Sequence, residues 1–382
     1  MSFATPDSAI VAARAVARGF AERAAHYDRT GEFPHENFAR LRDAGLLNLT
    51  VPSAHGGAGF GLAAAAAAIG AIAAGEPSTA LVLAMQYMFQ ATIARNAAWP
   101  AALRERLARE SVAGMALVNA LRVEPELGTP ARGGLPLTTA TRTADGWQLS
   151  GRKIYATGIP VLRWLIVWAR TPEAEPLVGW WLVPAAAPGV RVIETWDHAG
   201  MRATASHDVQ FDAVAVPADH AVDVRPVAKW GAPDPFQTAW NAFILSALYD
   251  GIARGARDWL VAYLQNRVPS NLGAPLASLP RFQAAVGEIE ARLMVSARLL
   301  QGATAEVDAG RTPSPAEAGL IKLAVTGNAI RAVESGLELI GNPGLSRHNP
   351  LERHYRDVLC SRIHSPQNDT IVSVAGRAAL GI

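Results

Sequence analysis

Cysteine is nearly absent from the chain, and so is any excess of charge of one sign. Cys360 is the single cysteine among 382 residues, which excludes an internal disulfide and a cysteine-cluster metal site. The 35 basic residues are balanced by 33 acidic ones without a dense basic block, so no nucleic-acid surface is indicated. We expect a protein of a reducing cytoplasm that binds no nucleic acid and no metal.

Long apolar runs and targeting signals are missing as well. The first seven residues lack the basic and then apolar order of a secretory signal. The most apolar stretch, residues 61–75, is mostly alanine and too short to cross a bilayer of about 30 Å. We expect this stretch to be a buried helix and the protein to have no membrane association.

Residue patterns divide the chain into three predicted domains, residues 1–113, 114–225 and 226–382. In the first, apolar residues recur at helical spacing, including a helix at 35–49, and the glycines of 51–61 form a loop. The second is rich in Val, Ile, Thr and Trp, which is typical of strands. Its strands are expected at 137–143, 147–150, 162–169, 178–183, 190–196 and 208–216, with a hairpin at 144–146.

Helical periodicity returns in the third domain, in long segments at 236–267, 279–310 and 315–340. Helices of this length predict a bundle. The order helical, β, helical excludes an alternating strand-helix sheet. The glycines at 56–59 follow no strand and lack the spacing of a nicotinamide-binding fingerprint.

Five segments, in order, resemble the acyl-CoA dehydrogenase superfamily over nearly the whole chain. They are residues 38–59, 149–158, 200–217, 267–283 and 338–357. The resemblance implies an α+β fold with an N-terminal helical domain, a middle β-barrel domain and a C-terminal four-helix bundle. It also implies FAD as cofactor, with FMN as the alternative, and a homo-oligomer, either a tetramer or a dimer.

The same resemblance assigns residues to the cofactor. They are Tyr155 and Thr157 behind the flavin, Arg267 and Gln283 at the pyrophosphate, and Glu338, Gly341 and Gly344 in the last motif. Asn119 and Gln367 are further candidates for the flavin edge, because an amide both donates and accepts hydrogen bonds. In the family the arginine reaches the cofactor of a neighbouring subunit, which requires an oligomer.

Each of these residues also has a purely structural interpretation. A lone glycine is commonly a turn or helix cap, Arg267 alone is a solvated helix end, and Tyr155 is equally an ordinary strand aromatic. The segment 121–136 departs from the family's flavin loop, which leaves the contacts of Asn119 open. The loop histidines His55, His198 and His207 show no metal-ligand spacing, and we assign them no role.

The catalytic position departs from the dehydrogenase pattern. Acyl-CoA dehydrogenases remove a proton next to a thioester with a glutamate while the flavin takes a hydride. Counting from Arg356-Asp357 places Ser365 at that register, and the alternative register on the first long helix of the third domain holds Asn241. Asp250 and Asp369 lie near the two registers as displaced carboxylates, although a solvated aspartate or a helix cap explains either one.

His364 is therefore the candidate catalytic residue, together with Ser365. The resemblance here is to the flavin monooxygenases of this fold, above all dibenzothiophene monooxygenase, whose Arg-to-His-x-Pro spacing recurs from Arg356 to Pro366. Imidazole, with an ordinary pKa of about 6.5, donates or accepts a proton near neutral pH. The structural alternative is a histidine packed against a backbone carbonyl. Gly158 after Thr157 also departs from the dehydrogenases' Thr-Asn and favours the hydroxylases.

Three functions follow from these residues. The first is a two-component monooxygenase that receives reduced flavin from a separate reductase and oxidises a small apolar or aromatic substrate with oxygen. The second is a divergent acyl-CoA dehydrogenase with a relocated base, which passes electrons to an electron-transfer flavoprotein. The third is a non-catalytic scaffold that has kept the fold.

Overall fold

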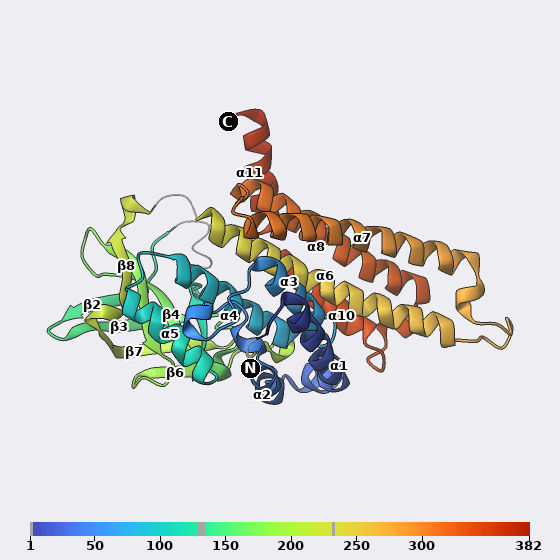
Figure 1. The fold of residues 1–382 in the computed structure, drawn as a ribbon, viewed down its shortest axis with the longest axis horizontal. Coiled ribbons are helices and arrows are strands. Elements are labelled where there is room, and N and C mark those ends of the chain that lie inside the picture. Colours follow the sequence, from blue (N-terminus) through green and yellow to red (C-terminus); the bar gives the residue numbers. More distant parts are fainter. Residues whose placement is uncertain (1–2, 128–133, 231–233) are drawn as a thin grey trace.

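The computed structural model describes residues 3–127, 134–230 and 234–382. Five helices come first, then the strands of one sheet, then a group of long helices that extends away from the sheet (Figure 1). This order is the predicted α+β arrangement. Within the described residues, no helix combines the length and the apolar character needed to cross a membrane.

The first five helices are α1 (Pro6–Thr30), α2 (His35–Asp43), α3 (Leu62–Ala73), α4 (Pro77–Arg95) and α5 (Ala101–Ala113). Side-chain caps define two of the starts: Thr5 forms a capping box on α1, and the Glu76 carboxylate accepts the first amides of α4. The helix expected at 35–49 is wrong in its second half. It ends at Asp43 because Gly45 is left-handed (φ 74°), and Leu46–Asn48 form a short 3-10 turn.

The eight strands form a single sheet of order β6-β7-β3-β2-β4-β5-β8, and β1 pairs in parallel with β4. The strands are β1 (Leu117–Leu121), β2 (Thr139–Thr143), β3 (Gly146–Lys153), β4 (Leu162–Arg170), β5 (Leu177–Pro184), β6 (Val190–Ile193), β7 (Asp208–Pro217) and β8 (Ala221–Pro226). The hairpin at 144–146 is confirmed as β2–β3. The strand expected at 190–196 ends instead at Ile193, and β1 and β8 were not predicted individually.

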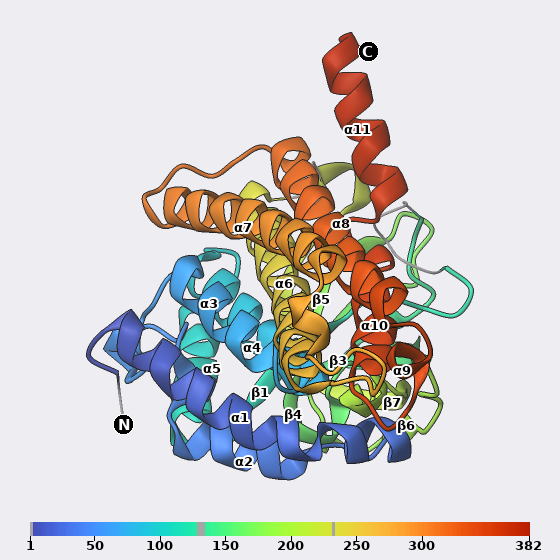
Figure 2. The ribbon, with the colours of Figure 1, turned by 90° about the vertical axis from the view of Figure 1, so that its right-hand side faces the viewer.

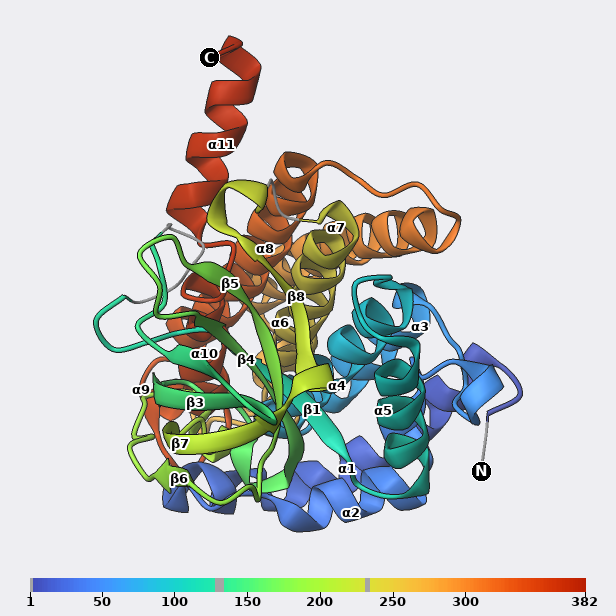
Figure 3. The ribbon, with the colours of Figure 1, turned by 90° about the vertical axis from the view of Figure 1, so that its left-hand side faces the viewer.

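The C-terminal elements are α6 (Pro235–Asn266), α7 (Pro280–Asp308), α8 (Pro315–Ile340), α9 (Asn342–Leu345), α10 (Leu351–Leu359) and α11 (Asn368–Leu380). The three long helices match their predicted ranges to within two residues. Figures 2 and 3 show α6 inside the molecule, between α3 and α4 on one side and α7, α8 and α10 on the other, whereas α11 projects outward.

Small residues let α6 approach the N-terminal helices closely. A Cβ atom on Gly251 would lie 2.2 Å from the carbonyl oxygen of Gly70, and one on Gly255 would lie 2.5 Å from that of Ala74. Consequently almost every side chain of α6 from Ala239 to Ala253 is buried. Polar side chains on this half of α6, including Asn241 and Tyr249, must therefore find partners within the protein.

Candidate active site

The turn after β3 carries Tyr155 and Thr157 in a strained backbone. Tyr155 has φ 60°, and Gly158 has φ 78°, values that a tyrosine rarely adopts and a glycine adopts at little cost. A Cβ atom on Gly158 would lie 2.5 Å from Cγ1 of Val82 on α4. The departure from the dehydrogenases' asparagine therefore has a local cause, because α4 leaves no room for a side chain there.

Hydrogen bonds fix the same turn from two sides. The Asn119 amide donates from Nδ2 to the Thr157 carbonyl oxygen at 3.0 Å, and its Oδ1 accepts the Ala120 amide at 2.8 Å. Ser206 donates from its hydroxyl to Thr157 Oγ1 at 3.0 Å. Asn119 is 4% exposed, so its amide group holds the turn; its contact with a cofactor stays a prediction.

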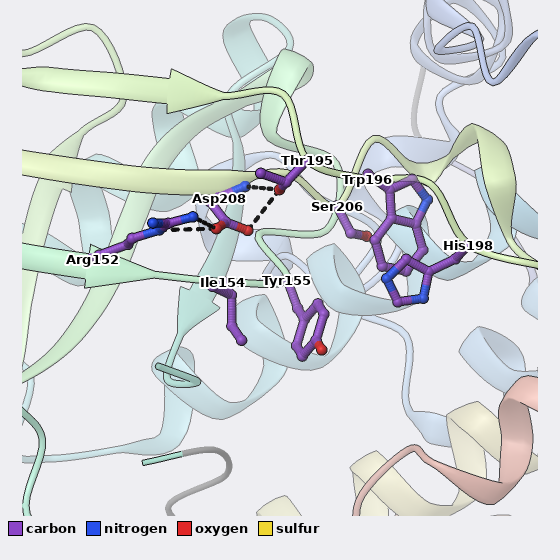
Figure 4. Close-up of a pocket in the computed structure, with 8 residues that line it drawn as sticks. All are labelled: Arg152, Ile154, Tyr155, Thr195, Trp196, His198, Ser206 and Asp208. Atoms are coloured by element: carbon purple, nitrogen blue, oxygen red, sulfur yellow. Dashed lines mark hydrogen bonds and ion pairs between the residues drawn. The ribbon is translucent and has the colours of Figure 1, made fainter. Parts of the chain in front are cut away.

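Tyr155 lines a hollow between β3, β7 and the loop after β6 (Figure 4). The volume of the hollow, about 320 Å³, is near the lower end of the usual range for small-molecule sites. Trp196 and His198 stack on each other with ring centroids 3.7 Å apart, and Tyr155 meets both edge-on. The side chain of Tyr155 is half exposed. The remaining wall is mostly polar and consists of Arg152, Ile154, Thr195, Ser206 and Asp208.

The polar wall is held by an ion pair and by a histidine. Arg152 contacts Asp208 at 2.6 Å, and Asp208 also accepts the Thr195 hydroxyl at 2.7 Å. His207 Nδ1 accepts the backbone amides of Thr195 and Trp196, both at 3.1 Å. His198 and His207, to which the sequence assigned no role, therefore line or support this hollow. Among the described residues no cluster fits a metal ion.

His364 lies at the second part of the site, against α6. Its Nδ1 atom is 2.5 Å from the hydroxyl of Tyr249, a side chain with no exposed surface. Burial, with Lys322 as the second cause, lowers the pKa of His364 to about 4. The imidazole is therefore neutral at physiological pH. The structural alternative expected a backbone carbonyl oxygen as the partner of the ring, whereas the partner of Nδ1 is the Tyr249 hydroxyl.

Two further contacts hold the segment around His364. Lys322 on α8 donates from Nζ to the carbonyl oxygens of Ser361, His364 and Pro366 at 3.3, 2.9 and 2.8 Å. Asn241 donates from Nδ2 to the Ser365 carbonyl oxygen at 2.7 Å. The two positions that the family resemblance predicts for the glutamate, Asn241 and Ser365, thus meet in space.

The two candidate carboxylates near these registers have other partners. Asp250 forms an ion pair with Arg254 one turn further along α6, at 2.6 Å. Asp369 is exposed at the start of α11, where it accepts the Thr370 amide at 2.9 Å. Asp250 is buried in the middle of α6, so it is neither the solvated aspartate nor the helix cap of the structural interpretation, and its carboxylate is bound by Arg254.

The loop after His198 connects the hollow to the His364 segment. A Cβ atom on Gly200 would lie 2.5 Å from the Arg356 carbonyl oxygen, and the Met201 amide donates to Asp357 Oδ1 at 2.7 Å. Arg356 binds Asp28 of α1 at 2.6 Å. Arg356 and Asp357 therefore connect the C-terminal helices with the loop after His198 in the β domain and with α1 of the N-terminal domain.

The other predicted cofactor residues gather at the far end of the bundle. Arg267 ends α6, Gln283 lies near the start of α7, and Glu338, Gly341 and Gly344 lie around the end of α8. Arg281 joins the start of α7 to the end of α8, because its guanidinium donates to the Leu339 carbonyl oxygen. Since Arg267 follows Asn241 by 26 positions on one helix, the rise of a helix separates them by roughly 39 Å.

Arg267 thus lies at the end of α6 that is remote from Asn241 and the His364 segment. Arg267, Gln283 and Glu338 are all exposed, and Gln283 donates to the Ala277 carbonyl oxygen at 3.0 Å. Gln367 is half-buried next to the His364 segment. Residues 128–133 of the segment that departs from the family's flavin motif lie outside the described residues. Before them, Glu124 forms a buried ion pair with Lys153 at 2.6 Å.

Several residues of this site were not found from the sequence, among them Trp196, His198, Tyr249 and Lys322 as well as the polar lining of the hollow. Tyr249 follows Asn241 by eight positions, which places both on one face of a helix. Lys322 is one of only three lysines in the chain and lies among apolar residues in a helical pattern, which is unusual for a solvated lysine. Both signals were available, but neither identifies a partner.

The residues of the hollow fit a flavin ring in their chemistry. A strained tyrosine with an exposed ring, beside a stacked Trp-His pair, offers aromatic surface to a planar heterocycle. Ser206, Thr195 and the Arg152–Asp208 pair add hydrogen-bonding groups around it. The separate end with Arg267 supplies a guanidinium of the kind that binds diphosphates.

Known proteins resemble the chain over nearly its whole length. Residues 10–109, 123–214 and 243–368 match the N-terminal, middle and C-terminal domains of acyl-CoA dehydrogenase. YdbM of Bacillus subtilis, whose name places it among the acyl-CoA dehydrogenases without a substrate, is 31% identical over 94% of this chain and 92% of its own. L-evernosamine nitrososynthase of a Micromonospora species is 31% identical over 93% and 86%.

A solved structure shows the same fold with a flavin. FMN-bound TdsC, a dibenzothiophene monooxygenase from Paenibacillus sp. A11-2, superimposes with a TM-score of 0.82 at 24% identity, covering 98% of this chain and 97% of its own. The likeness confirms the predicted three-part architecture.

Proposed function

The chain belongs to the acyl-CoA dehydrogenase family, and we propose that it is a two-component monooxygenase within that family. It is a flavin-dependent oxidoreductase, as the members of the family are. In the proposed reaction, one substrate molecule, one O₂ and one reduced flavin give the oxygenated substrate, one water and one oxidised flavin. The substrate is a small apolar or aromatic molecule.

The observation that carries this proposal is the contact between Asn241 and Ser365. Removal of the proton next to a thioester needs a carboxylate opposite the flavin, and the two places where the family carries one are occupied here by an amide and by a serine whose carbonyl oxygen accepts from it. His364 directly precedes Ser365 in the chain, and its imidazole is neutral. These groups suit hydrogen bonding to oxygen species better than proton abstraction from carbon.

Support from relatives is divided, but it includes oxygen chemistry. The nitrososynthase at 31% identity makes a nitroso compound according to its name, and a nitroso group carries an oxygen atom on nitrogen. YdbM, at the same identity, is named for the dehydrogenase side. Our choice of a monooxygenase over a dehydrogenase therefore depends on Asn241 and Ser365, the residues at the positions predicted for the glutamate.

Within the proposal, each predicted site residue has a role. Tyr155 and Thr157, with Trp196 and His198, hold the flavin ring, while Asn119 and Gln367 lie toward its edge. Arg267, Gln283, Glu338, Gly341 and Gly344 contact the cofactor of a neighbouring subunit in a dimer or tetramer. The flavin, FAD or FMN, supplies the two electrons for oxygen. His364 serves the reacting oxygen, and Ser365 positions the segment.

The remaining partners follow from the two-component reaction. A separate reductase in the cytoplasm supplies the reduced flavin, because no nicotinamide-binding fingerprint is present in the sequence. A dehydrogenase would instead deliver electrons from its substrate to an electron-transfer flavoprotein. The source of the electrons thus distinguishes the two functions in a single experiment.

The test uses the purified flavin-loaded protein in two arms. In one, oxidised enzyme is mixed anaerobically with a panel of acyl-CoAs, and flavin absorbance is followed. In the other, a flavin reductase with NADH supplies reduced flavin in air, and aromatic and heteroaromatic substrates are screened for ¹⁸O incorporation from ¹⁸O₂. We expect ¹⁸O-labelled product and no bleaching. Rapid bleaching by any acyl-CoA contradicts the proposal.

A further inference from the structure

Tyr249 and His364 form a hydrogen-bonded pair between parts of the chain that are 115 residues apart. The two polar atoms are 2.5 Å apart, and the ring centroids lie at 5.8 Å. Tyr249 comes from the fully buried half of α6, whereas His364 is half-buried on the segment after α10. The phenol therefore approaches the imidazole from the interior of the protein.

The direction of this hydrogen bond follows from what surrounds the phenol. Tyr249 has no exposed surface, and its hydroxyl contacts no polar atom other than His364 Nδ1 in the part of the chain that the structure describes. If Nδ1 carried the proton and donated, the phenol hydrogen would be buried without an acceptor, which is unfavourable. The phenol therefore donates, and Nδ1 accepts.

The opposite nitrogen of His364 is the one that remains open. Nε2 has no hydrogen-bond partner among the described residues, and it is not one of the buried polar atoms left without a partner. In a neutral imidazole with an acceptor at Nδ1, the single ring proton is on Nε2. The ring thus directs an N–H group away from α6 and toward the open side of the segment.

Charges around the pair keep both groups in these protonation states. Burial raises the pKa of Tyr249 well above its usual value, and Cys360 and Asp357 act in the same direction. Burial and the nearby Lys322 ammonium lower the pKa of His364 to about 4. Between about pH 5 and 8 the phenol is therefore protonated and the imidazole is neutral.

We propose that Tyr249 is a positioning residue that fixes the tautomer of His364, so that His364 acts on the reacting oxygen as a hydrogen-bond donor through Nε2. The inference rests on the proposed function and makes it more specific. An Nε2 atom that carries the proton cannot accept one, and Nδ1 is occupied by the phenol. His364 is therefore not the base that deprotonates a substrate.

The tautomer is read directly by ¹⁵N NMR of the full-length protein labelled at histidine, without turnover. His364→Gln identifies the His364 signals. We expect the wild-type ring to show a protonated Nε2 and an unprotonated Nδ1 at pH 7. In Tyr249→Phe, which keeps the ring volume, we expect the two nitrogen shifts to move toward each other as both tautomers become populated.

Tyr87→Phe is the matched control. Tyr87 is a second fully buried tyrosine, and its hydroxyl donates to the Leu46 carbonyl oxygen at 2.5 Å. Its substitution removes one buried phenol hydrogen bond elsewhere and should leave the His364 signals unchanged. A wild-type ring protonated at Nδ1, or His364 shifts that do not respond to Tyr249→Phe, would overturn the inference.

A second readout separates this inference from the proposed function. With reduced flavin supplied, Tyr249→Phe should lower product per oxygen consumed severalfold and raise hydrogen peroxide release, with little change in substrate KM. If the tautomer is as proposed but no substrate is oxygenated, the proposed function fails and the inference about the pair stands. If oxygenation depends on His364 but not on Tyr249, only the inference fails.

Discussion

Asn241 on α6 and Ser365, 124 positions later in the chain, are joined by a 2.7 Å hydrogen bond from the amide Nδ2 to the backbone carbonyl oxygen. The contact explains why an amide is useful at this register. A carboxylate has no proton to donate at neutral pH, so it would repel the carbonyl oxygen that Asn241 binds. Asn241, at the position predicted for the base, thus holds the segment that carries His364.

The Asn241 bond should therefore be measurable as stability. We expect Asn241→Ala to lower the free energy of unfolding by about 0.5–1.5 kcal/mol, because a half-buried carbonyl oxygen loses its donor. Asn266→Ala is the control on the same helix: Asn266 also donates to a carbonyl oxygen, at 2.8 Å, but it is exposed. Thermal unfolding followed by circular dichroism compares the two; equal losses would contradict a role for Asn241 in holding the His364 segment.

Removal of the imidazole should uncouple oxygen consumption from product formation. In His364→Ala we expect product formation to fall at least about 100-fold, the lower range for a positioned acid-base group, while reduced flavin is still oxidised in air and hydrogen peroxide accumulates. His26→Ala, at an exposed histidine paired with Glu32, serves as control. Product and peroxide are quantified together. Undiminished product in His364→Ala would return His364 to a packing role.

The aromatic surface of the hollow should contribute to flavin affinity. We expect Tyr155→Ala to weaken binding of FMN or FAD by about 2- to 10-fold, because an aromatic contact contributes about 0.5–1.5 kcal/mol. Tyr155→Phe keeps the ring and should bind as the wild type does. Fluorescence titration gives both dissociation constants. Equal affinities for all three proteins would mean that the ring does not contact the flavin.

Gly158 should tolerate no side chain. We expect Gly158→Ala to destabilise the protein by more than about 1 kcal/mol, since a positive φ and a contact with Val82 both oppose the new Cβ. Gly310→Ala isolates the first effect: Gly310 has φ 91° and no atom within 4 Å of an added Cβ. Val82→Ala in the Gly158→Ala background should recover part of the difference. Chemical denaturation measures each variant.

Asp357 should make stability depend on pH. Burial raises the pKa of its carboxyl to about 7 from an ordinary value near 3.8. The unfolded chain ionises first, so the contribution of the protonated carboxyl to folding is complete below about pH 4 and is lost as the pH rises through 7. The Asp357→Asn side chain can still accept a hydrogen bond from the Met201 amide. Because it does not titrate, its variant should not lose stability in this pH range.

The measurement is the melting temperature of both proteins at pH 5 and pH 8. From pH 5 to pH 8, the melting temperature of the wild type should fall by more than that of the Asp357→Asn variant. Asp43→Asn, at an exposed carboxylate, controls for a general charge effect. A parallel pH response in wild type and Asp357→Asn would show that this carboxyl ionises normally.

The sequence by itself determined the α+β order and the long helices. Periodicity and turn residues act over a few positions, so the helices at 235–266 and 315–340 and the hairpin at Gly146 were predictable from their own residues. The end of α2 was missed because Gly45, a single left-handed residue, outweighed an apolar pattern that continued to Leu49. Counting from the family's motifs predicted roles for Ser365, Asn241 and His364, and these roles stay predictions.

Only the tertiary structure decided what those residues contact. The pairs Asn241–Ser365 and Tyr249–His364 join positions 124 and 115 apart, and no local pattern encodes which distant group a buried polar side chain will meet. Tyr249 is fully buried on α6 close to Asp357, Cys360 and His364, and this burial requires a partner for its hydroxyl. Side-chain type set the available chemistry, and packing selected the hydrogen bonds.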